Sequence, residues 1–278
     1  MESTFWSGQT RRSAIDRQCE PMILALDIGN SQIYAGVFDT HGELILTFRK
    51  SSKSATSSDE IGVFLKSVLR ENDLDPQLIR KIAVCSVVPD LNHTVASCCV
   101  KYFALNPFML QAGTKTGLSI KYRNPVEVGS DRIANAIAAT KIYPDKNLII
   151  IDYGTATTFC AVSKQKEYLG GVIIPGLRLM MESLEANTSK LPAVSIVRAK
   201  NVVAKSTVEG IQAGLYLTTL SATKHITDEI KRDYFNHSDT LVLGTGGFAR
   251  LYEQENIFDA FLPELVLKGL FYALEMNT

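Results

Sequence analysis

The chain has 278 residues, 46% of them hydrophobic, and it carries 29 basic and 29 acidic side chains. This length allows one large or two medium domains with a sizeable buried core. The balanced charge gives no electrostatic reason to expect a nucleic acid or an anionic membrane as a partner, and no apolar run reaches the roughly 20 residues of a membrane-spanning helix.

The first 21 residues are polar and irregular, and they lack the apolar core of a secretory signal. The first strand pattern begins directly after Pro21, at Met22. We therefore expect residues 1–21 to be an extension outside the fold, either disordered or a product of start-site choice with Met22 as the working start.

Five cysteines are spread along the chain, and their number is odd. No pair has the two-residue gap of a zinc-binding clip, and both Cys85 and Cys160 lie in apolar, strand-like runs. Thiols in such runs are usually buried and reduced. The cysteine pattern therefore predicts a cytoplasmic protein.

Strand patterns and helix patterns alternate in the first half of the folded chain. For one of the helices we expect Ser58 to be the capping residue, because Asp59 and Glu60 follow it in the first turn. The predicted elements are two strands within 22–39, strands at 41–51, 79–89 and 107–112, and helices at 58–73, 91–105 and 129–144.

The second half begins with the same kind of strand pair. Two pairs, Gly170-Gly171 and Pro175-Gly176, are expected to break the strand that follows. The predicted elements are two strands within 148–163, a strand at 167–177, helices at 177–191 and 207–235, a strand, glycine turn and helix start within 240–254, and a closing segment at 258–276.

Two similar turns, around Asp27 and Asp152, lie close to half the folded chain apart. Each follows an apolar strand and precedes a second strand. The repeat predicts a duplicated α/β domain with a central cleft, divided into 22–146 and 147–278.

The first turn has the residues that a nucleoside triphosphate requires. Gly29 lets the backbone approach phosphates closely, and Asn30 and Ser31 add side-chain donors. Asp27 would be repelled by phosphate, so its expected task is to hold Mg²⁺ beside the phosphates, directly or through water. A hairpin with an Asx turn is the structural alternative.

The second turn offers Asp152, Thr155 and two further threonines to the same place. A third glycine turn, at 243–251, suggests a close backbone contact with adenosine or phosphate, and a tight strand-to-helix connection is the structural alternative. The chain contains neither the G-x-G-x-x-G spacing nor a P-loop, so the Rossmann and P-loop classes are excluded.

Asp131 is the candidate catalytic residue. It lies at the start of the predicted helix at 129–144, where a carboxylate that merely caps the helix is the alternative. As a general base it would accept the proton of a substrate hydroxyl, while Arg132 binds a substrate anion or the transferring phosphate. Phosphoryl transfer needs positioned reactants, a metal ion, positive charge and an aligned nucleophile.

Taken together, these motifs make the chain similar to the type III pantothenate kinases, in the acetate and sugar kinase/Hsp70/actin superfamily. The match runs from about Met22 to the C-terminus, and the order and spacing of its motifs are more specific than any single motif. The matching positions are Asp27-x-Gly29-Asn30, Gly129-x-Asp131-Arg132, Asp152-x-Gly154-Thr155-Ala156-Thr157-Thr158, Gly170-Gly171-x-Ile173-x-Pro175-Gly176 and Leu191-Pro192.

The resemblance implies duplicated actin/ribonuclease H-like domains with the active site in the interdomain cleft. It implies ATP-dependent phosphorylation of pantothenate to 4′-phosphopantothenate, the first step of coenzyme A biosynthesis, with Mg²⁺ and a monovalent cation, K⁺ or NH₄⁺. It also implies a homodimer.

Residue roles follow from the same resemblance. Asp152 would bind the monovalent cation, and Thr207 would line the pantothenate pocket from across the dimer interface. Pantothenate contacts are implied for Tyr122, Gly129, Ser130, Asp131 and Arg132. ATP contacts are implied for Thr155 and for the run Asp27, Ile28, Gly29, Asn30, Ser31, Gln32, Ile33 and Tyr34.

One position departs from the family pattern, which usually has Thr where this chain has Ser31. Serine keeps the hydroxyl, so the phosphate contact should survive in a looser turn. Two other functions stay open at this point. Some family members are described as accessory regulators of gene expression, and a kinase of the same superfamily could use another hydroxyl acceptor.

Overall fold

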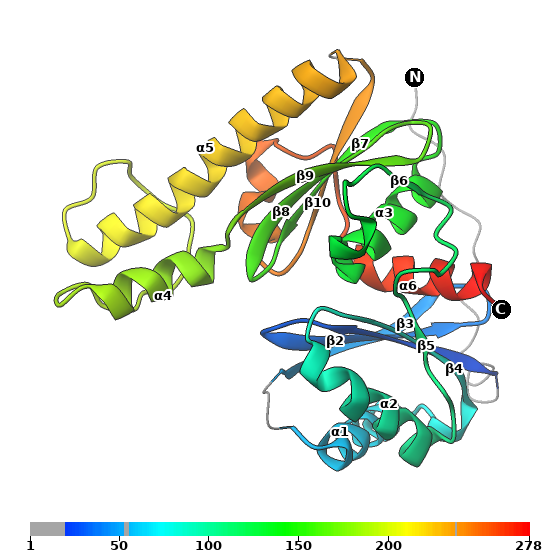
Figure 1. Ribbon diagram of the computed structural model, residues 1–278. Helices are drawn as coiled ribbons and strands as arrows, with labels where there is room; N and C mark the ends of the chain where they lie inside the picture. Colours follow the sequence, from blue (N-terminus) through cyan, green and yellow to red (C-terminus); the bar gives the residue numbers. More distant parts are fainter. Residues whose placement is uncertain (1–19, 53–55, 237) are drawn as a thin grey trace, which may run out of the picture.

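Two β-sheets with helices between and around them make up the protein (Figure 1). The computed structural model describes residues 20–52, 56–236 and 238–278. Residues 1–19 of the expected extension therefore lie outside the described residues, and Pro21 leads directly into the first strand. No helix in the described ranges is both long and apolar enough to cross a membrane.

The first sheet has the strand order β3-β2-β1-β4-β5. The first three strands pair antiparallel as a meander, and β4 and β5 continue the sheet in parallel from β1. Helices α1 (Ser58–Glu71) and α2 (Pro89–Phe103) cover one face. The strands are β1 (Met22–Ile28), β2 (Gln32–Asp39), β3 (Leu44–Ser51), β4 (Ile79–Ser86) and β5 (Phe108–Met109).

The second sheet has the order β11-β10-β7-β8-β9-β6. Its first five strands repeat the order and directions of the first sheet, with β7, β8 and β9 as the meander and β10 and β11 parallel to β7. The predicted duplication is therefore confirmed. The strands are β6 (Ser119–Ile120), β7 (Asn147–Tyr153), β8 (Ala156–Val162), β9 (Glu167–Pro175), β10 (Thr240–Thr245) and β11 (Ala260–Phe261).

Helices α3 (Ser130–Ile142) and α6 (Leu265–Met276) lie between the two sheets (Figure 1). Their close approach depends on Gly269 of α6, where an added Cβ would lie 1.9 Å from the Ala134 carbonyl oxygen of α3. The C-terminal helix thus packs on the first sheet, whereas the short strand β6, which comes before α3, joins the second sheet. The chain crosses between the halves more than once.

Helices α4 (Leu177–Asn187) and α5 (Thr207–Phe235) belong to the second half. Helix α4 and the N-terminal part of α5 extend away from the two sheets, whereas the C-terminal part of α5 packs on the second sheet (Figure 1). Three short 3₁₀ segments complete the described elements. They are η2 (Pro76–Leu78), η3 (Pro125–Glu127) and η4 (Ala249–Glu255).

Side-chain alternation in the strands directs both predicted turn carboxylates toward α3. In β1, Leu24 and Leu26 pack against the α1–α2 layer, so Ala25 and Asp27 point to the opposite face. In β7, Ile150 packs on the α3 side, and Asp152 follows it two residues later on the same face. Both central strands are buried on both faces, which explains their continuous apolar runs.

Two local predictions are wrong. The cap of α1 is Ser57 and not Ser58, because Ser57 Oγ accepts the Glu60 N–H at 3.2 Å while the Glu60 carboxylate accepts the Ser57 N–H at 2.7 Å. The glycine pair does not interrupt β9. Gly170 has a φ of 130° at a register shift opposite β8, and Gly171 lies where a Cβ would be 1.7 Å from the Phe159 carbonyl oxygen.

Candidate active site

The start of α3 is fixed to the first sheet by a pair of serines. Ser130 Oγ donates to the Ser86 carbonyl oxygen and accepts the Ser86 N–H, both at 3.0 Å. Because Ser86 ends β4, this pair holds the first turn of α3 beside the end of β1, which pairs with β4. Gly129 is the N-cap residue, as the sequence predicts for the Gly-Ser-Asp tripeptide.

Asp131 follows in that first turn. Its Oδ1 accepts the Arg132 N–H at 2.7 Å, but the N-cap position belongs to Gly129, so Asp131 is not the capping residue considered from sequence. Burial raises the pKa of the Asp131 carboxyl, against the lowering effect of the Arg132 N–H and of the guanidinium charge. This hydrogen bond does not exclude catalysis, because it uses one of the two carboxylate oxygens.

Asp27 ends β1 with its carboxyl group buried beside β4. The Cys85 thiol donates to Asp27 Oδ1 at 3.3 Å. Burial, together with the negative charges of Asp131 and Asp152, raises the pKa of Asp27 to about 7, although the Cys85 hydrogen bond and the Arg49 charge lower it.

Asp152 occupies the equivalent place at the end of β7. Asn135, one turn after Asp131 on α3, donates to Asp152 Oδ2 at 3.0 Å. Burial and the charge of Asp131 raise the pKa of Asp152 to about 6. Gly246, with a φ of 90°, lies where a Cβ would be 2.3 Å from Asp152 Oδ1, so the third glycine turn packs directly against this carboxylate.

Three carboxylates from the first sheet, α3 and the second sheet therefore act on one another electrostatically. Within the described ranges no three histidine, cysteine or acidic side chains are grouped closely enough to form a metal cage. A buried, like-charged set with few neutralising partners still fits cations. Mg²⁺ in particular is usually held by one or two carboxylates together with substrate phosphates. Asp27 and Asp152 have the donor chemistry for this.

The two strand-end turns also touch each other. The Ser31 hydroxyl and the Thr155 hydroxyl are 2.8 Å apart, across the two halves of the chain. Both side chains are exposed, and so is Asn30. The side chains of Ile28 and Ile33 are buried in the core under the first sheet, so from these two positions only the backbone could contact a ligand.

Arg132 is a buried cation, with 6% of its surface exposed. Its Nε donates to Cys160 Sγ at 3.3 Å, and its Cζ lies 5.8 Å from the centre of the Tyr168 ring. Its Nη2 atom has no hydrogen-bond partner in the part of the chain that the structure describes. A guanidinium in this situation favours an anionic ligand group, since an unpaired buried charge is costly.

Aromatic rings and a glycine pair lie around this arginine. The Tyr122 ring is 6.4 Å from the Tyr168 ring, and an added Cβ at Gly170 would lie 3.5 Å from Tyr122. At Gly171 the added Cβ would be 3.0 Å from Arg132 Nη2. The structure thus brings Tyr122 close to Arg132, and the expected contact of both residues with pantothenate stays a prediction.

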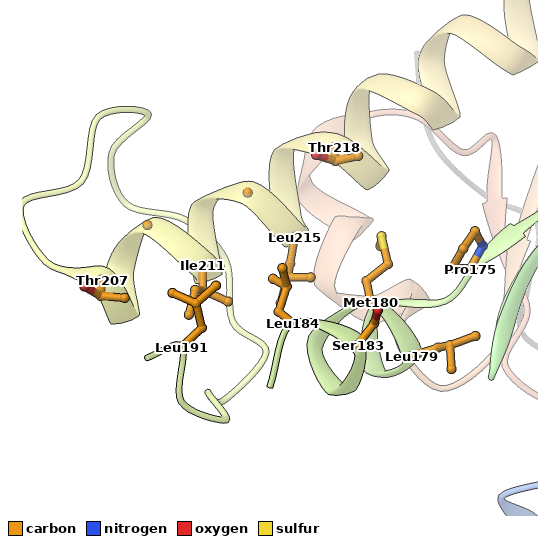
Figure 2. Close-up of a pocket in the computed structure, with 12 residues that line it drawn as sticks. Pro175, Leu179, Met180, Ser183, Leu184, Leu191, Thr207, Ile211, Leu215 and Thr218 are labelled. Carbon is orange, nitrogen blue, oxygen red and sulfur yellow. The ribbon is translucent and has the colours of Figure 1, made fainter. Parts of the chain in front are cut away.

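Thr207 lies apart from the three carboxylates. It is the first residue of α5 and lines an open groove of about 830 Å³ between α4 and α5, with apolar walls that include Leu179, Ile211 and Leu215. Figure 2 shows Thr207 at one end of this groove. Within one chain it does not join the other predicted site residues.

Several residues at the site were not predicted from sequence. Asn135 and Tyr168 sit in helix and strand patterns that look like core, and Cys85 and Cys160 were expected to be inert buried thiols. All four described cysteines are free and buried, as expected. The available signal was spacing: Asn135 lies one helical turn after Asp131, on the same face.

Comparison with known proteins identifies the family. A model described as type III pantothenate kinase matches residues 23–229. A type III pantothenate kinase from Legionella pneumophila (strain Paris) is 57% identical over 92% of this chain and 100% of its own length. One from Elusimicrobium minutum is 49% identical over 92% of this chain and 99% of its own length. A solved structure described as a 2-dehydro-3-deoxygalactonokinase from Sinorhizobium meliloti shares the fold, with a TM-score of 0.59 and 12% identity over 91% of this chain and 96% of that one.

The raised pKa values predict that Asp27→Asn stabilises the ligand-free protein. The folded state holds the Asp27 proton up to about pH 7, whereas the unfolded state releases it near 3.8, so stability falls as pH rises through this range. Above pH 7 the carboxylate costs up to about 4 kcal/mol, and Asn removes that cost. We expect a melting temperature several degrees higher at pH 8 without added cations, and a smaller gain toward pH 4.

The exposed Asp228→Asn on α5 is the control for this measurement and should leave the melting temperature unchanged. A lower melting temperature for Asp27→Asn at pH 8 would contradict the electrostatic description of the site.

Proposed function

This chain belongs to the type III pantothenate kinase family, and we propose that the residues gathered at the start of α3 carry out its reaction. The protein phosphorylates pantothenate with ATP to give 4′-phosphopantothenate, which opens coenzyme A biosynthesis. One observation supports the residue assignment. The carboxylates of Asp27, Asp131 and Asp152 come from different elements, yet the charge of Asp131 raises the pKa values of the other two.

Asp27, Ser31 and Thr155 form the ATP phosphate site in this proposal. A kinase that uses ATP implies a divalent metal such as Mg²⁺, which offsets phosphate charge. Asp27 holds this ion directly or through water. The Ser31 and Thr155 hydroxyls exchange their mutual hydrogen bond for phosphate oxygens, and Asp152 holds a monovalent cation, K⁺ or NH₄⁺.

Arg132 and Tyr122 bind pantothenate with the help of Gly129 and Ser130. The unpaired Nη2 of Arg132 supports this, because pantothenate carries a carboxylate that can serve as its missing partner.

Asp131 acts as the general base. Burial moves its pKa upward, toward the range in which a base works best at neutral pH. It accepts the proton of the 4′-hydroxyl as that oxygen bonds to the γ-phosphorus of ATP. The bond between the γ-phosphorus and the bridging oxygen breaks, and ADP leaves.

A second copy of the chain covers the groove between α4 and α5. The groove wall and its surroundings expose large apolar side chains, which a monomer would leave in water. Thr207 on this groove would then reach the pantothenate pocket of the other subunit. The exposed side chains are Ile173 at 58%, Leu179 at 46%, Val208 at 43%, Val202 at 76% and Val203 at 82%.

The cellular place and the domain division are also proposals. Free cysteine thiols support a cytoplasmic location, where thiols stay reduced. We divide the folded chain into domains at 22–146 and 147–278, with α6 returning from the second to pack on the sheet of the first.

Asp131→Asn tests the catalytic assignment. We expect turnover to fall about 10²–10⁴-fold, because the amide cannot accept the hydroxyl proton, while ATP and pantothenate affinities change little in calorimetric titrations. Asp90→Asn is a matched control, since Asp90 also lies in the first turn of a helix but is exposed on α2. Near-normal turnover of Asp131→Asn would remove it from this role.

Mixing subunits tests the contribution of Thr207 across the proposed interface. Thr207→Glu should raise the KM for pantothenate, since its charge repels the substrate carboxylate. A heterodimer of Asp131→Asn and Thr207→Glu subunits keeps one intact site, so equal mixing should restore roughly a quarter of wild-type activity by random pairing. Activity no higher than the sum of the two parents would argue that Thr207 serves its own subunit, or no site at all.

A further inference from the structure

Three residues form a row across the first sheet. Asp27 of β1 lies opposite Tyr34 of β2, which in turn lies opposite Arg49 of β3. Tyr34 packs on the same face as Ala25, toward α3 and α6, so the whole row faces the side on which Asp131 lies.

Arg49 is held along this row by the tyrosine ring. Its Cζ lies 3.7 Å from the centre of the Tyr34 ring, which is a close cation–π contact. Because Tyr34 lies directly opposite Asp27, an Arg49 side chain held over the Tyr34 ring lies on the β2 side of the end of β1. Adjacent strands are about 4.8 Å apart. Because the Arg49 side chain folds over the Tyr34 ring, it covers part of the distance from β3 to Asp27.

Tyr34 engages the Arg49 guanidinium through its ring and its hydroxyl, which leaves other donors of Arg49 available. Its side chain is exposed, and among the described residues no carboxylate lies within ion-pair distance of it. Contact with the ring uses the face of the guanidinium, and the N–H groups that do not bond to Tyr34 stay free in its plane. An arginine in this state is suited to binding an oxyanion in bidentate fashion.

The site needs such a cation on this side. ATP adds several negative charges beside three carboxylates, and phosphoryl transfer depends on positive charge around the phosphates. Arg132 is buried on the other side of α3, next to Cys160. In the first sheet, Arg49 is the cation whose charge acts on Asp27.

We propose that Arg49, stacked on Tyr34, binds the polyphosphate of ATP. The inference rests on the proposed function of the same site and adds a phosphate-binding residue to it. Tyr34 positions the guanidinium, and its own expected contact with ATP then runs through Arg49.

The test compares Arg49→Gln with Lys50→Gln. Lys50 is the next residue of β3 and points to the opposite face, where its Nζ lies 5.9 Å from the Phe64 ring of α1. Both substitutions remove one positive charge from the same strand. Calorimetric titrations with Mg²⁺ would measure the affinities for ADP, for the non-hydrolysable analogue AMPPNP and for adenosine, beside the KM for ATP.

We expect Arg49→Gln to weaken ADP and AMPPNP binding about tenfold or more and to leave adenosine binding unchanged, as for the loss of a charged hydrogen bond. Arg49→Lys keeps the charge but not the planar fork, so its ADP and AMPPNP affinities should lie between those of wild type and Arg49→Gln. Lys50→Gln should bind all three ligands normally. Equal ADP affinities for Arg49→Gln and Lys50→Gln would overturn the proposal. So would an adenosine loss as large as the ADP loss, which would indicate a structural role.

Failure of the proposed function gives a different result. If the wild-type protein bound ADP but did not phosphorylate pantothenate, the acceptor would be wrong, and the comparison of Arg49→Gln with Lys50→Gln would still decide the role of Arg49. If Arg49→Gln proved unfolded by circular dichroism, Arg49→Lys would decide it, and ADP binding of Arg49→Lys equal to wild type would overturn the bidentate contact.

Discussion

Buried negative charge at the start of α3 is the constraint on which the rest of the structure depends. Asp27, Asp131 and Asp152 are all half-buried, and burial followed by the charge of Asp131 raises the pKa of each of the other two. Unrelieved, such a group destabilises a fold. Its neighbours offset part of the cost: the Arg132 N–H at Asp131, the Asn135 amide at Asp152 and the first-turn N–H groups of α3. What remains is a strong preference for cations, which ATP brings with it as the magnesium complex.

Duplication explains how two such carboxylates come to face one helix. The same meander, followed by parallel strands, occurs twice, and in both copies the strand alternation points the last polar residue toward α3. Between the sheets, α3 and α6 pack against each other through Gly269 and form a shared layer. The Ser31–Thr155 hydrogen bond then joins the two turns. Ligands that enter between these hydroxyls would meet both halves at once.

The sequence predicts the parts of the site that depend on local rules. A carboxylate after an apolar strand and an Asp at a helix start are recognisable within a few residues. The turns at Asp27 and Asp152 both show the first of these patterns. The rest depends on non-local pairing. The place of Arg49 over Tyr34 is set by a register shift between β2 and β3 that no pattern in β3 reveals. The short strand β6, with two residues, has no periodicity to detect, and Cys160 becomes an acceptor for Arg132 only because β8 passes beside α3.

The most direct measurement is release of ADP from ATP and Mg²⁺, with and without pantothenate, in K⁺ and again in Na⁺. We expect ADP to appear only when pantothenate is present and to appear faster in K⁺, because the role proposed for Asp152 is to hold K⁺ or NH₄⁺. Folded, dimeric protein that releases no pantothenate-dependent ADP in either salt would contradict the assignment of acceptor and site. Equal rates in K⁺ and Na⁺ would contradict the role of Asp152 alone.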